Sequence, residues 1–195
     1  MSLLNKFFDL AVKMDDINIA WRSREGESHY YNTPVDAFIF MSTGIDGDSC
    51  CIVPREGDET LENSPVYFLS PCMNSSAVVW IAKNFHDFLR LIILCKTVYR
   101  ARDIYSMSAI EFNNDLMEQE KEMAEFPVWQ DTNMDEIMAS ILEILPITSE
   151  KYDYDYFISC YQNEENHLEL SFLSDVSMRS YKLGCYGETE WLDQT

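Results

Sequence analysis

Four short apolar segments, separated by polar turn residues, constrain the fold of this chain more than any other feature. They are Val35–Met41, Cys50–Val53, Pro65–Ser70 and Ala77–Ala82. The stretch from Gly44 to Asp48 contains the Asp-Gly pair that is typical of tight hairpin turns. Strands joined by such short connections pair with their neighbours in antiparallel fashion. The pattern therefore predicts an antiparallel meander of four strands.

One helix is predicted before this meander in the sequence, and another directly after it. Apolar residues in Ser2–Met14 recur every three or four positions, which is the spacing of an amphipathic helix. After the fourth strand, Asn84 stands as a helix N-cap with Asp87 three residues on. Apolar residues in Phe85–Ile93 then fall on one helical face, so we expect both helices to pack on the sheet.

Two further helices are predicted in the second half. Ser108 with Glu111 is a capping box, and it precedes a strongly acidic helical stretch. A fourth helix follows Thr132 and stops at Pro146, because proline breaks the helical hydrogen bonding.

After Thr148 the apolar period changes from 3.6 to 2, and this change predicts strands. Tyr152, Tyr154 and Tyr156 alternate with acidic residues, and a second alternating run covers 168–172. We expect these runs to form a β-hairpin with its turn at Asn163–Asn166, and Met178–Leu183 to add one more strand. The expected fold is α+β: an antiparallel meander packed by helices over residues 1–130, and a helix plus β-hairpin extension over 131–195 on the same core.

Charge limits the class of partner. The 195 residues include 34 acidic and 14 basic ones, for a net charge of −20. Proteins that bind nucleic acids neutralise phosphates with clustered Lys and Arg. The charge therefore disfavours DNA or RNA and favours a basic protein partner. The oligomeric state stays open.

Hydropathy and cysteine usage predict a cytoplasmic protein that does not enter membranes. The longest apolar run, Leu89–Cys95, is interrupted by Arg90 and is too short for a membrane span, and no cleavage-type signal is visible. Cys50 and Cys51 are adjacent, and a chain of this length needs no disulfide framework. We expect free, mostly buried thiols.

No motif commits the chain to a reaction or a cofactor. The turn at Asp46 departs from a calcium loop, since Gly47 and Cys50 stand at its second and fifth positions. The cysteines and His86 lack zinc-ligand spacing, and no nucleophile elbow or glycine-rich phosphate loop is present. We therefore expect no metal, no cofactor and no enzymatic activity.

Several of these segments resemble the SUKH superfamily, which includes the yeast glucan-synthesis regulator and many bacterial toxin-immunity proteins. The similar stretches are Thr33-Pro34 with the Ser42–Gly47 turn, then Pro65–Pro71, and then Val78–Lys96, which reads VVWIAKNFHDFLRLIILCK. Together they span residues 33–96. The resemblance implies a SUKH-like α+β binding domain without catalytic activity, in many members one that neutralises a toxin in the cytoplasm.

Acidic side chains are the candidate binding residues. The charge and the resemblance together favour a non-enzymatic domain that binds a basic protein, specifically an immunity protein that neutralises a basic toxin. An alternative is a small-molecule or regulatory domain, with a pocket between the sheet and the Phe85–Ile93 helix. The candidate partner surface consists of Asp46, Asp48, Glu56, Asp58, Glu59, Glu118, Glu122 and Glu125.

Overall fold

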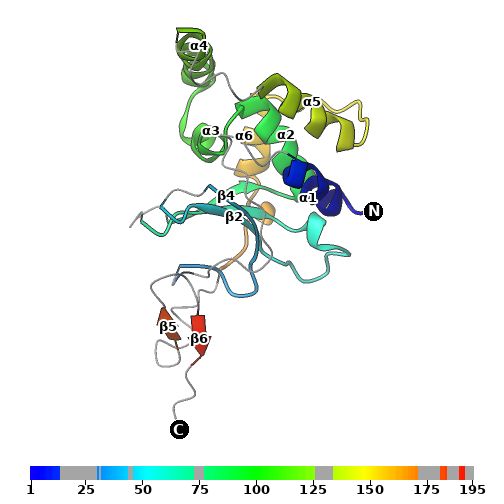
Figure 1. The fold of residues 1–195 in the computed structure, drawn as a ribbon, viewed down its shortest axis with the longest axis vertical. Coiled ribbons are helices and arrows are strands. Elements are labelled where there is room, and N and C mark those ends of the chain that lie inside the picture. The colour runs from blue at the N-terminus through cyan, green and yellow to red at the C-terminus, as the bar shows by residue number, and fades with distance from the viewer. Residues whose placement is uncertain are drawn as a thin grey trace.

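The computed structural model describes residues 1–13, 30, 32–43, 46–72, 77–125, 134–170, 181–183 and 189–191. Figure 1 shows helices gathered on one side of the sheet formed by the first four strands. In chain order the elements are α1 (Leu3–Lys13), β1 (Phe38–Ser42), β2 (Ser49–Ile52), the 3-10 helix η1 (Leu61–Asn63), β3 (Val66–Leu69), β4 (Val78–Ala82), α2 (Phe85–Cys95), α3 (Val98–Asp103), the 3-10 helix η2 (Ile104–Ser106), α4 (Ala109–Glu125), α5 (Met134–Ile144), α6 (Tyr154–Gln162), the 3-10 helix η4 (Glu164–Asn166), β5 (Tyr181–Leu183) and β6 (Thr189–Trp191).

Strands β1 to β4 form one open sheet in chain order, and every neighbouring pair is antiparallel. The central pair runs in register from Ser49 opposite Leu69 to Ile52 opposite Val66. This arrangement confirms the predicted meander and the general α+β class.

The turn between β1 and β2 depends on its Asp-Gly pair. Asp46 and Gly47 have φ angles of 52° and 77°, and tight hairpin turns with positive φ at both central residues favour this dipeptide. A Cβ on Gly47 would lie 2.6 Å from the hydroxyl oxygen of Tyr30. The turn therefore requires glycine at this position both for its backbone angle and for this close approach.

Aromatic side chains fill the layer between the sheet and the helices. The ring centroid of Phe40 in β1 lies 5.2 Å from those of Phe85 and Phe88 in α2. Phe7 of α1 lies 5.4 Å from Phe85. All four side chains are at most 1% exposed, and burying rings of this size dominates the energetics of a core. This cluster therefore holds α1 and α2 against the sheet.

Helices from the second half of the chain share this core. Ile137 and Ile141 of α5 and Phe157 of α6 belong to the same buried cluster as the sheet residues. Residues far apart along the chain thus bury one continuous apolar layer.

Helix α2 has the predicted N-terminal cap. The Asn84 side-chain oxygen accepts a hydrogen bond from the Asp87 backbone N–H at 2.8 Å, which satisfies one of the free donors at the helix start. The helix ends at Lys96, whose φ of 65° places it in the left-handed conformation that commonly terminates helices.

Helix α3, which joins α2 to α4, was not predicted from the sequence. Arg100 of this helix is 9% exposed. Its Nη1 donates to the Cys95 carbonyl oxygen at 2.6 Å, and its Nε donates to the Asp115 carboxylate on α4. A buried guanidinium needs such partners, so Arg100 links three consecutive helices.

Helix α4 begins with both halves of the predicted capping box. The Ser108 backbone N–H donates to the Glu111 carboxylate at 2.7 Å, and the Glu111 N–H donates to the Ser108 hydroxyl oxygen at 3.3 Å. The first bond favours the charged carboxylate and holds the pKa of Glu111 below its ordinary value.

The predicted strand over Tyr152, Tyr154 and Tyr156 is wrong, because Tyr154–Gln162 forms helix α6. Asp153 caps this helix by accepting a hydrogen bond from the Tyr156 N–H at 3.1 Å. Tyr156 lies in the first turn of α6, whereas Tyr152 precedes the cap and packs back on the helix with 4.8 Å between the two ring centroids. The alternation with aspartate therefore marked a helix start, in which Asp153 is the cap.

The predicted partner strand of that hairpin is also wrong. Leu168 and Leu170 lie in a segment that is paired in no sheet, and the predicted turn at Asn163–Asn166 is largely the 3-10 helix η4. Phe172 lies outside the described residues.

The last described strands pair only with each other. Tyr181 of β5 lies opposite Trp191 of β6 in an antiparallel pair. The predicted strand Met178–Leu183 thus coincides with β5 over its last three residues, and 178–180 lie outside the described part of the chain. Among the described helices, none combines the length and the apolar character needed to cross a bilayer.

Candidate functional site

The second face of the sheet is apolar, like the face that the helices cover. Cys51 is fully buried there, and Tyr67, Leu69 and Trp80 are at most 4% exposed. Leu168 and Leu170 pack against this cluster. Both faces of the strands are therefore covered, which explains why the strand sequences are continuous apolar runs.

Residues 167–170, which we call the strap, are held against this face by two hydrogen bonds, one within the strap and one at the residue before it. The Leu168 backbone N–H donates to the Tyr67 hydroxyl oxygen at 3.1 Å. Just before the strap, the carbonyl oxygen of Asn166 accepts a hydrogen bond from the Trp80 indole at 2.9 Å. The ring of His167 stacks on Trp80 with 5.0 Å between centroids. The strap is thus fixed to the sheet by side chains of β3 and β4.

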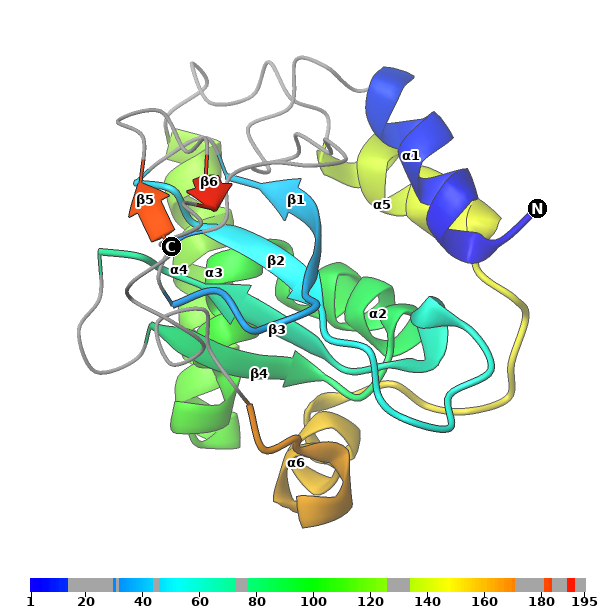
Figure 2. The ribbon, with the colours of Figure 1, turned by 90° about the horizontal axis from the view of Figure 1, so that it is seen from below.

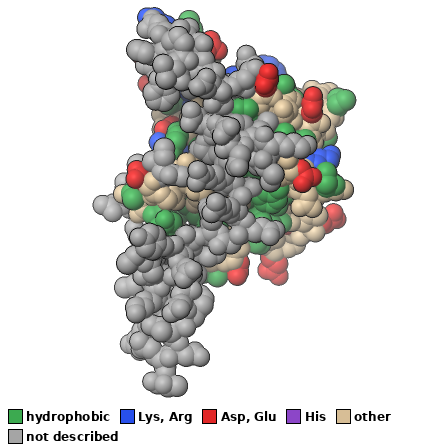
Figure 3. Space-filling view, in the orientation of Figure 1, with side chains coloured by type: hydrophobic (Ala, Val, Ile, Leu, Met, Phe, Trp, Pro, Cys, Tyr) green, Lys and Arg blue, Asp and Glu red, His purple; other side chains and the backbone are tan. Residues whose placement is uncertain are grey.

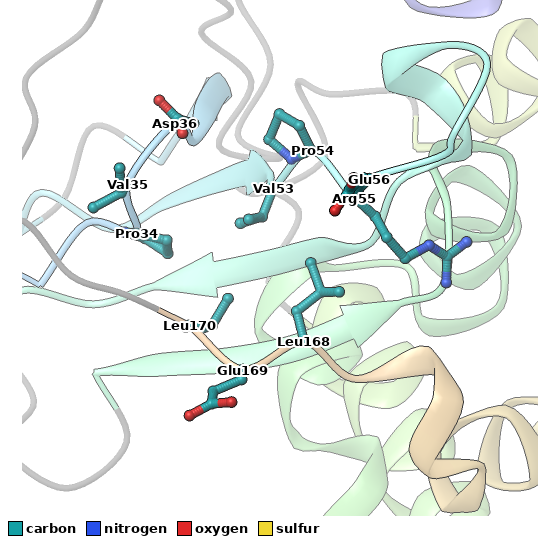
Figure 4. A pocket seen from close by; sticks show the side chains of 10 residues that line it. All are labelled: Pro34, Val35, Asp36, Val53, Pro54, Arg55, Glu56, Leu168, Glu169 and Leu170. Carbon is teal, nitrogen blue, oxygen red and sulfur yellow. The ribbon is translucent and has the colours of Figure 1, made fainter.

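A groove of about 430 Å³ lies between the strap and two segments that flank the first hairpin. Its lining comes from Pro34–Asp36, Val53–Glu56 and Leu168–Leu170. Figure 4 shows the side chains of Leu168 and Leu170 on the side of the strap that faces Pro34 and Val53. The floor of the groove is therefore apolar.

Three acidic residues belong to the lining of the groove. Asp36, Glu56 and Glu169 are exposed. Figure 4 shows the Glu169 side chain on the side of the strap opposite to Leu168 and Leu170, and the Asp36 carboxylate pointing away from the groove. None of the three makes an ion pair or side-chain hydrogen bond with the described part of the chain. They therefore add negative charge to the surface beside the groove.

The one basic residue in the groove lining is already neutralised. Arg55 Nε and Nη2 both donate to the Asp58 carboxylate, at distances of 3.0 to 3.3 Å. Asp58 also accepts a hydrogen bond from the Ser64 hydroxyl at 2.7 Å. This fork geometry holds the guanidinium in place, so the positive charge of Arg55 is offset by Asp58.

Two of the predicted surface acids are engaged inside the molecule. Asp48 is 7% exposed and accepts a hydrogen bond from the Ser70 hydroxyl at 2.6 Å. Asp58 is bound to Arg55, as described above. Asp46 is exposed in the hairpin turn. Of these three, only Asp46 presents at the surface a carboxylate that no described residue pairs with.

The remaining predicted acids do not gather in one patch. Glu56 and Glu59 are exposed in the segment between β2 and β3, whereas Glu118 is exposed on α4. Figures 1 and 2 place that segment and α4 on opposite sides of the molecule. Figure 3 likewise shows Asp and Glu side chains spread over the described part of one face. The side chains of Glu122 and Glu125 are not among those that the structure describes.

Sequence reasoning missed Asp36 and Glu169 as site residues. Asp36 lies two residues before β1 and has a φ of 63°, and Glu169 stands between two leucines that pack on the sheet. The Leu-Glu-Leu alternation did signal that the glutamate points away from the apolar side. Nothing in the sequence indicated that this segment lies beside the start of β1.

A second group of polar side chains joins α2 to α6. The carboxylate of Asp87, 3% exposed, accepts a hydrogen bond from the Tyr156 hydroxyl at 2.8 Å and lies 3.4 Å from Lys83 Nζ. Lys83 also donates to the Tyr156 oxygen at 2.7 Å, and His86 Nδ1 is 3.5 Å from the same carboxylate. Burial, and then Asp87, raise the pKa of Tyr156 far above its ordinary value. These groups bind one another and form a contact between helices, while the buried His86 Nε2 has no hydrogen-bond partner among the described residues.

The cysteines and the sheet-helix interface show no reactive centre in the described residues. The described cysteines, at 50, 51, 72, 95 and 160, are free, and burial raises the pKa of the Cys51 thiol far above its ordinary value. No cluster of potential metal ligands occurs within the described ranges. Phe85, Phe88 and Leu89 are fully buried between α2 and the sheet, so that interface is packed core where the alternative hypothesis expected a pocket.

Comparison with known proteins identifies no relative: no family model, curated protein or solved structure matches this chain. The SUKH resemblance over residues 33–96 thus stays a prediction.

Proposed function

We propose that this protein is a non-enzymatic binding domain that engages a basic protein partner through the groove beside the strap. The observation that carries the proposal is an apolar groove with exposed acidic residues beside it. Asp36, Glu56 and Glu169 belong to its lining, and none of them is paired with another described residue, whereas the neighbouring Arg55 is bound by Asp58. An apolar floor supplies binding energy, and unpaired carboxylates select for positive charge.

The net charge of −20 supports the same partner class. A field of one sign steers a basic protein toward the molecule and speeds association, most strongly at low salt. The groove lining offers aliphatic side chains, carboxylates and one bound arginine. We propose no chemistry at this site.

An immunity function in the cytoplasm is the specific form of this proposal, and it rests on the SUKH resemblance of residues 33–96. In that form the basic partner is a toxin domain. The described strands β1 to β4 and the capped helix α2 cover most of the stretches that carry the resemblance.

Salt dependence tests the general proposal. A synthetic peptide of alternating Arg and Ala residues is titrated into the protein by calorimetry between about 50 and about 500 mM salt, a range over which the Debye length falls several-fold. We expect binding that weakens steadily as salt rises, and none with the matched Glu-Ala peptide. Absence of binding to the Arg-Ala peptide at the lowest salt would exclude a charge-directed partner.

Small-molecule binding is the second candidate, and the size of the groove favours it. A volume of about 430 Å³ falls within the usual range of small-ligand pockets. A thermal-shift screen with metabolites separates the two functions, because only a ligand domain gains stability from an uncharged small molecule.

A further inference from the structure

We propose that the groove receives an extended segment of the basic partner, which lies alongside the strap. Two apolar side chains of that segment turn into the groove, and a basic side chain between them turns outward. This inference rests on the proposed function and specifies the conformation and sequence pattern of the bound segment. The alternation of the strap, its unpaired backbone groups and the apolar walls of the groove support it.

The side chains of the strap alternate between two sides, as they do in a β-strand. Leu168 and Leu170 pack on the buried cluster of the sheet, whereas Glu169 between them is exposed and points the other way in Figure 4. His167 has an extended backbone, with a φ of −98° and a ψ of 140°. Successive side chains of an extended chain point to opposite faces. The strap therefore has the side-chain pattern of a strand.

Backbone groups of the strap are available for pairing with another chain. The Leu168 N–H bonds to the Tyr67 hydroxyl, but the backbone N–H and C=O groups of Glu169 and Leu170 make no hydrogen bond with the described part of the chain. An unpaired extended segment is a template for strand addition. In that binding mode main-chain hydrogen bonds give affinity and alternate side chains give specificity. The strap therefore favours an extended polypeptide as the occupant of the groove.

The groove offers apolar surface for the inward side chains of such a segment. Pro34, Val35, Val53 and Pro54 belong to its lining together with the two leucines of the strap. Apolar side chains that enter it leave water, which is the main favourable contribution to most protein association. The strap is also held in place by hydrogen bonds from β3 and β4. A preformed site loses less entropy on binding than one that must first become ordered.

The outward position of the bound segment is next to Glu169, which points away from the groove. Side chains that lie across from each other on one face of paired strands interact: opposite charges stabilise the pair, and like charges destabilise it. A basic residue is therefore favoured opposite Glu169. The pattern that fits the strap is apolar, basic, apolar, which complements Leu168-Glu169-Leu170.

A second copy of this chain does not fit that pattern. Pairing of two straps would place two Glu169 carboxylates on the same face of the paired strands, where like charges repel. Each copy also carries a net charge of −20. Charge complementarity therefore selects a partner of the opposite sign.

The test uses two blocked peptides of the same composition, Gly-Ser-Val-Arg-Val-Ser-Gly and Gly-Ser-Val-Val-Arg-Ser-Gly. Each is titrated into the ¹⁵N-labelled full-length protein by NMR. We expect the first, alternating peptide to shift the amide signals of Val53, Glu169 and Leu170. It should bind about tenfold more tightly than the second, because the scrambled order leaves one valine in water. Equal affinities, or shifts confined to other parts of the protein, would overturn the inference.

Main-chain pairing has a separate signature in hydrogen exchange. With saturating alternating peptide, the amide of Glu169 or of Leu170 gains a hydrogen bond, so its exchange with water should slow by about fivefold. The amide of Ile147, whose side chain is fully exposed, serves as the control and should keep its rate. Unchanged exchange at both strap amides would refute pairing along the strap.

A charge swap tests the outward position. Glu169→Lys should weaken the alternating arginine peptide and strengthen its counterpart Gly-Ser-Val-Glu-Val-Ser-Gly, each by about threefold, because the favourable and unfavourable cross-strand pairs are exchanged. The ratio of the two affinities therefore changes about tenfold. The matched control Glu143→Lys makes the same change of charge at an exposed position of α5, and its ratio should change less than about twofold. Similar changes in both variants would overturn the strap as the site.

The calorimetric titration of the Arg-Ala peptide distinguishes failure of this inference from failure of the proposed function. If that peptide binds while the alternating and scrambled peptides bind equally well, the basic partner stands and the strap is refuted as its site. If the Arg-Ala peptide does not bind at the lowest salt, the proposed function fails together with this inference.

Discussion

Replacing Tyr67 with phenylalanine tests whether the strap wall of the groove is held by a specific hydrogen bond. The Tyr67 ring is 4% exposed, and its hydroxyl oxygen accepts the Leu168 N–H at 3.1 Å. Phenylalanine retains the buried ring, so the change removes the hydroxyl while the apolar contacts remain. The Leu168 N–H, which is partly buried, then lacks its partner.

The expected cost follows from that single bond. A net intramolecular hydrogen bond is worth about 1 kcal/mol, and a donor left unsatisfied costs up to about 3 kcal/mol. Because Leu168 is only half-buried, we expect a loss near the lower figure. A loss of about 1 kcal/mol corresponds to a fall in Tm of about 2–4 °C for a chain of this size. If the loss is confined to the strap, its amides should exchange about fivefold faster.

Hydrogen exchange followed by mass spectrometry measures the strap directly, and urea unfolding measures the whole molecule. The matched control is Tyr99→Phe, because no hydrogen bond of the Tyr99 hydroxyl occurs among the described residues. Exchange at Leu168 should accelerate in Tyr67→Phe and stay unchanged in Tyr99→Phe. Unaltered exchange over 167–170 in Tyr67→Phe would refute the view that this bond fixes the groove wall.

Three further predictions concern the core, the turn and the buried thiols. Phe40→Ala should cost about 3–5 kcal/mol in urea unfolding, because it leaves a cavity between β1 and α2; a cost below about 1 kcal/mol would contradict the aromatic cluster. Gly47→Ala should lower the unfolding midpoint, because alanine disfavours a φ of 77° and its Cβ would meet Tyr30, and an unchanged midpoint would count against the turn. Burial raises the pKa of Cys51 above its unfolded value. The contribution of the neutral thiol to the free energy of unfolding is therefore fully present below about pH 8.5, where the unfolded thiol is also protonated, and it decreases as pH rises above that value. The free energy of unfolding should therefore fall less steeply with pH above pH 8.5 in the Cys51→Ala variant, and the two slopes should differ by about 1.4 kcal/mol per pH unit. Equal slopes in unfolding measured from pH 8 to 10.5 would contradict a buried neutral thiol.

Local sequence signals predicted most of the described elements. The Asp-Gly turn, the Asn84 cap and the Ser108 capping box each act within a few residues, and each makes the expected backbone geometry or hydrogen bond. The four apolar runs indicated the four strands of the sheet, and the structure shows buried apolar clusters on both of its faces. The antiparallel pairing was predicted because strands that follow each other closely along the chain usually pair as hairpins.

Contacts between distant residues decided the rest. The tyrosine run at 152–156 fits either a helix or a strand by its spacing. Its assignment to α6 follows from the local Asp153 cap, which the strand prediction overlooked, together with distant contacts such as that between the Tyr154 hydroxyl and the Met107 carbonyl oxygen. The groove exists only because Tyr67 and Trp80 bring the strap beside residues that precede β1. Sequence alone determined where most of the helices and strands form, because propensity, caps and turns are local. The tertiary structure decided which carboxylates share a site, because their proximity depends on packing between segments that no local signal connects.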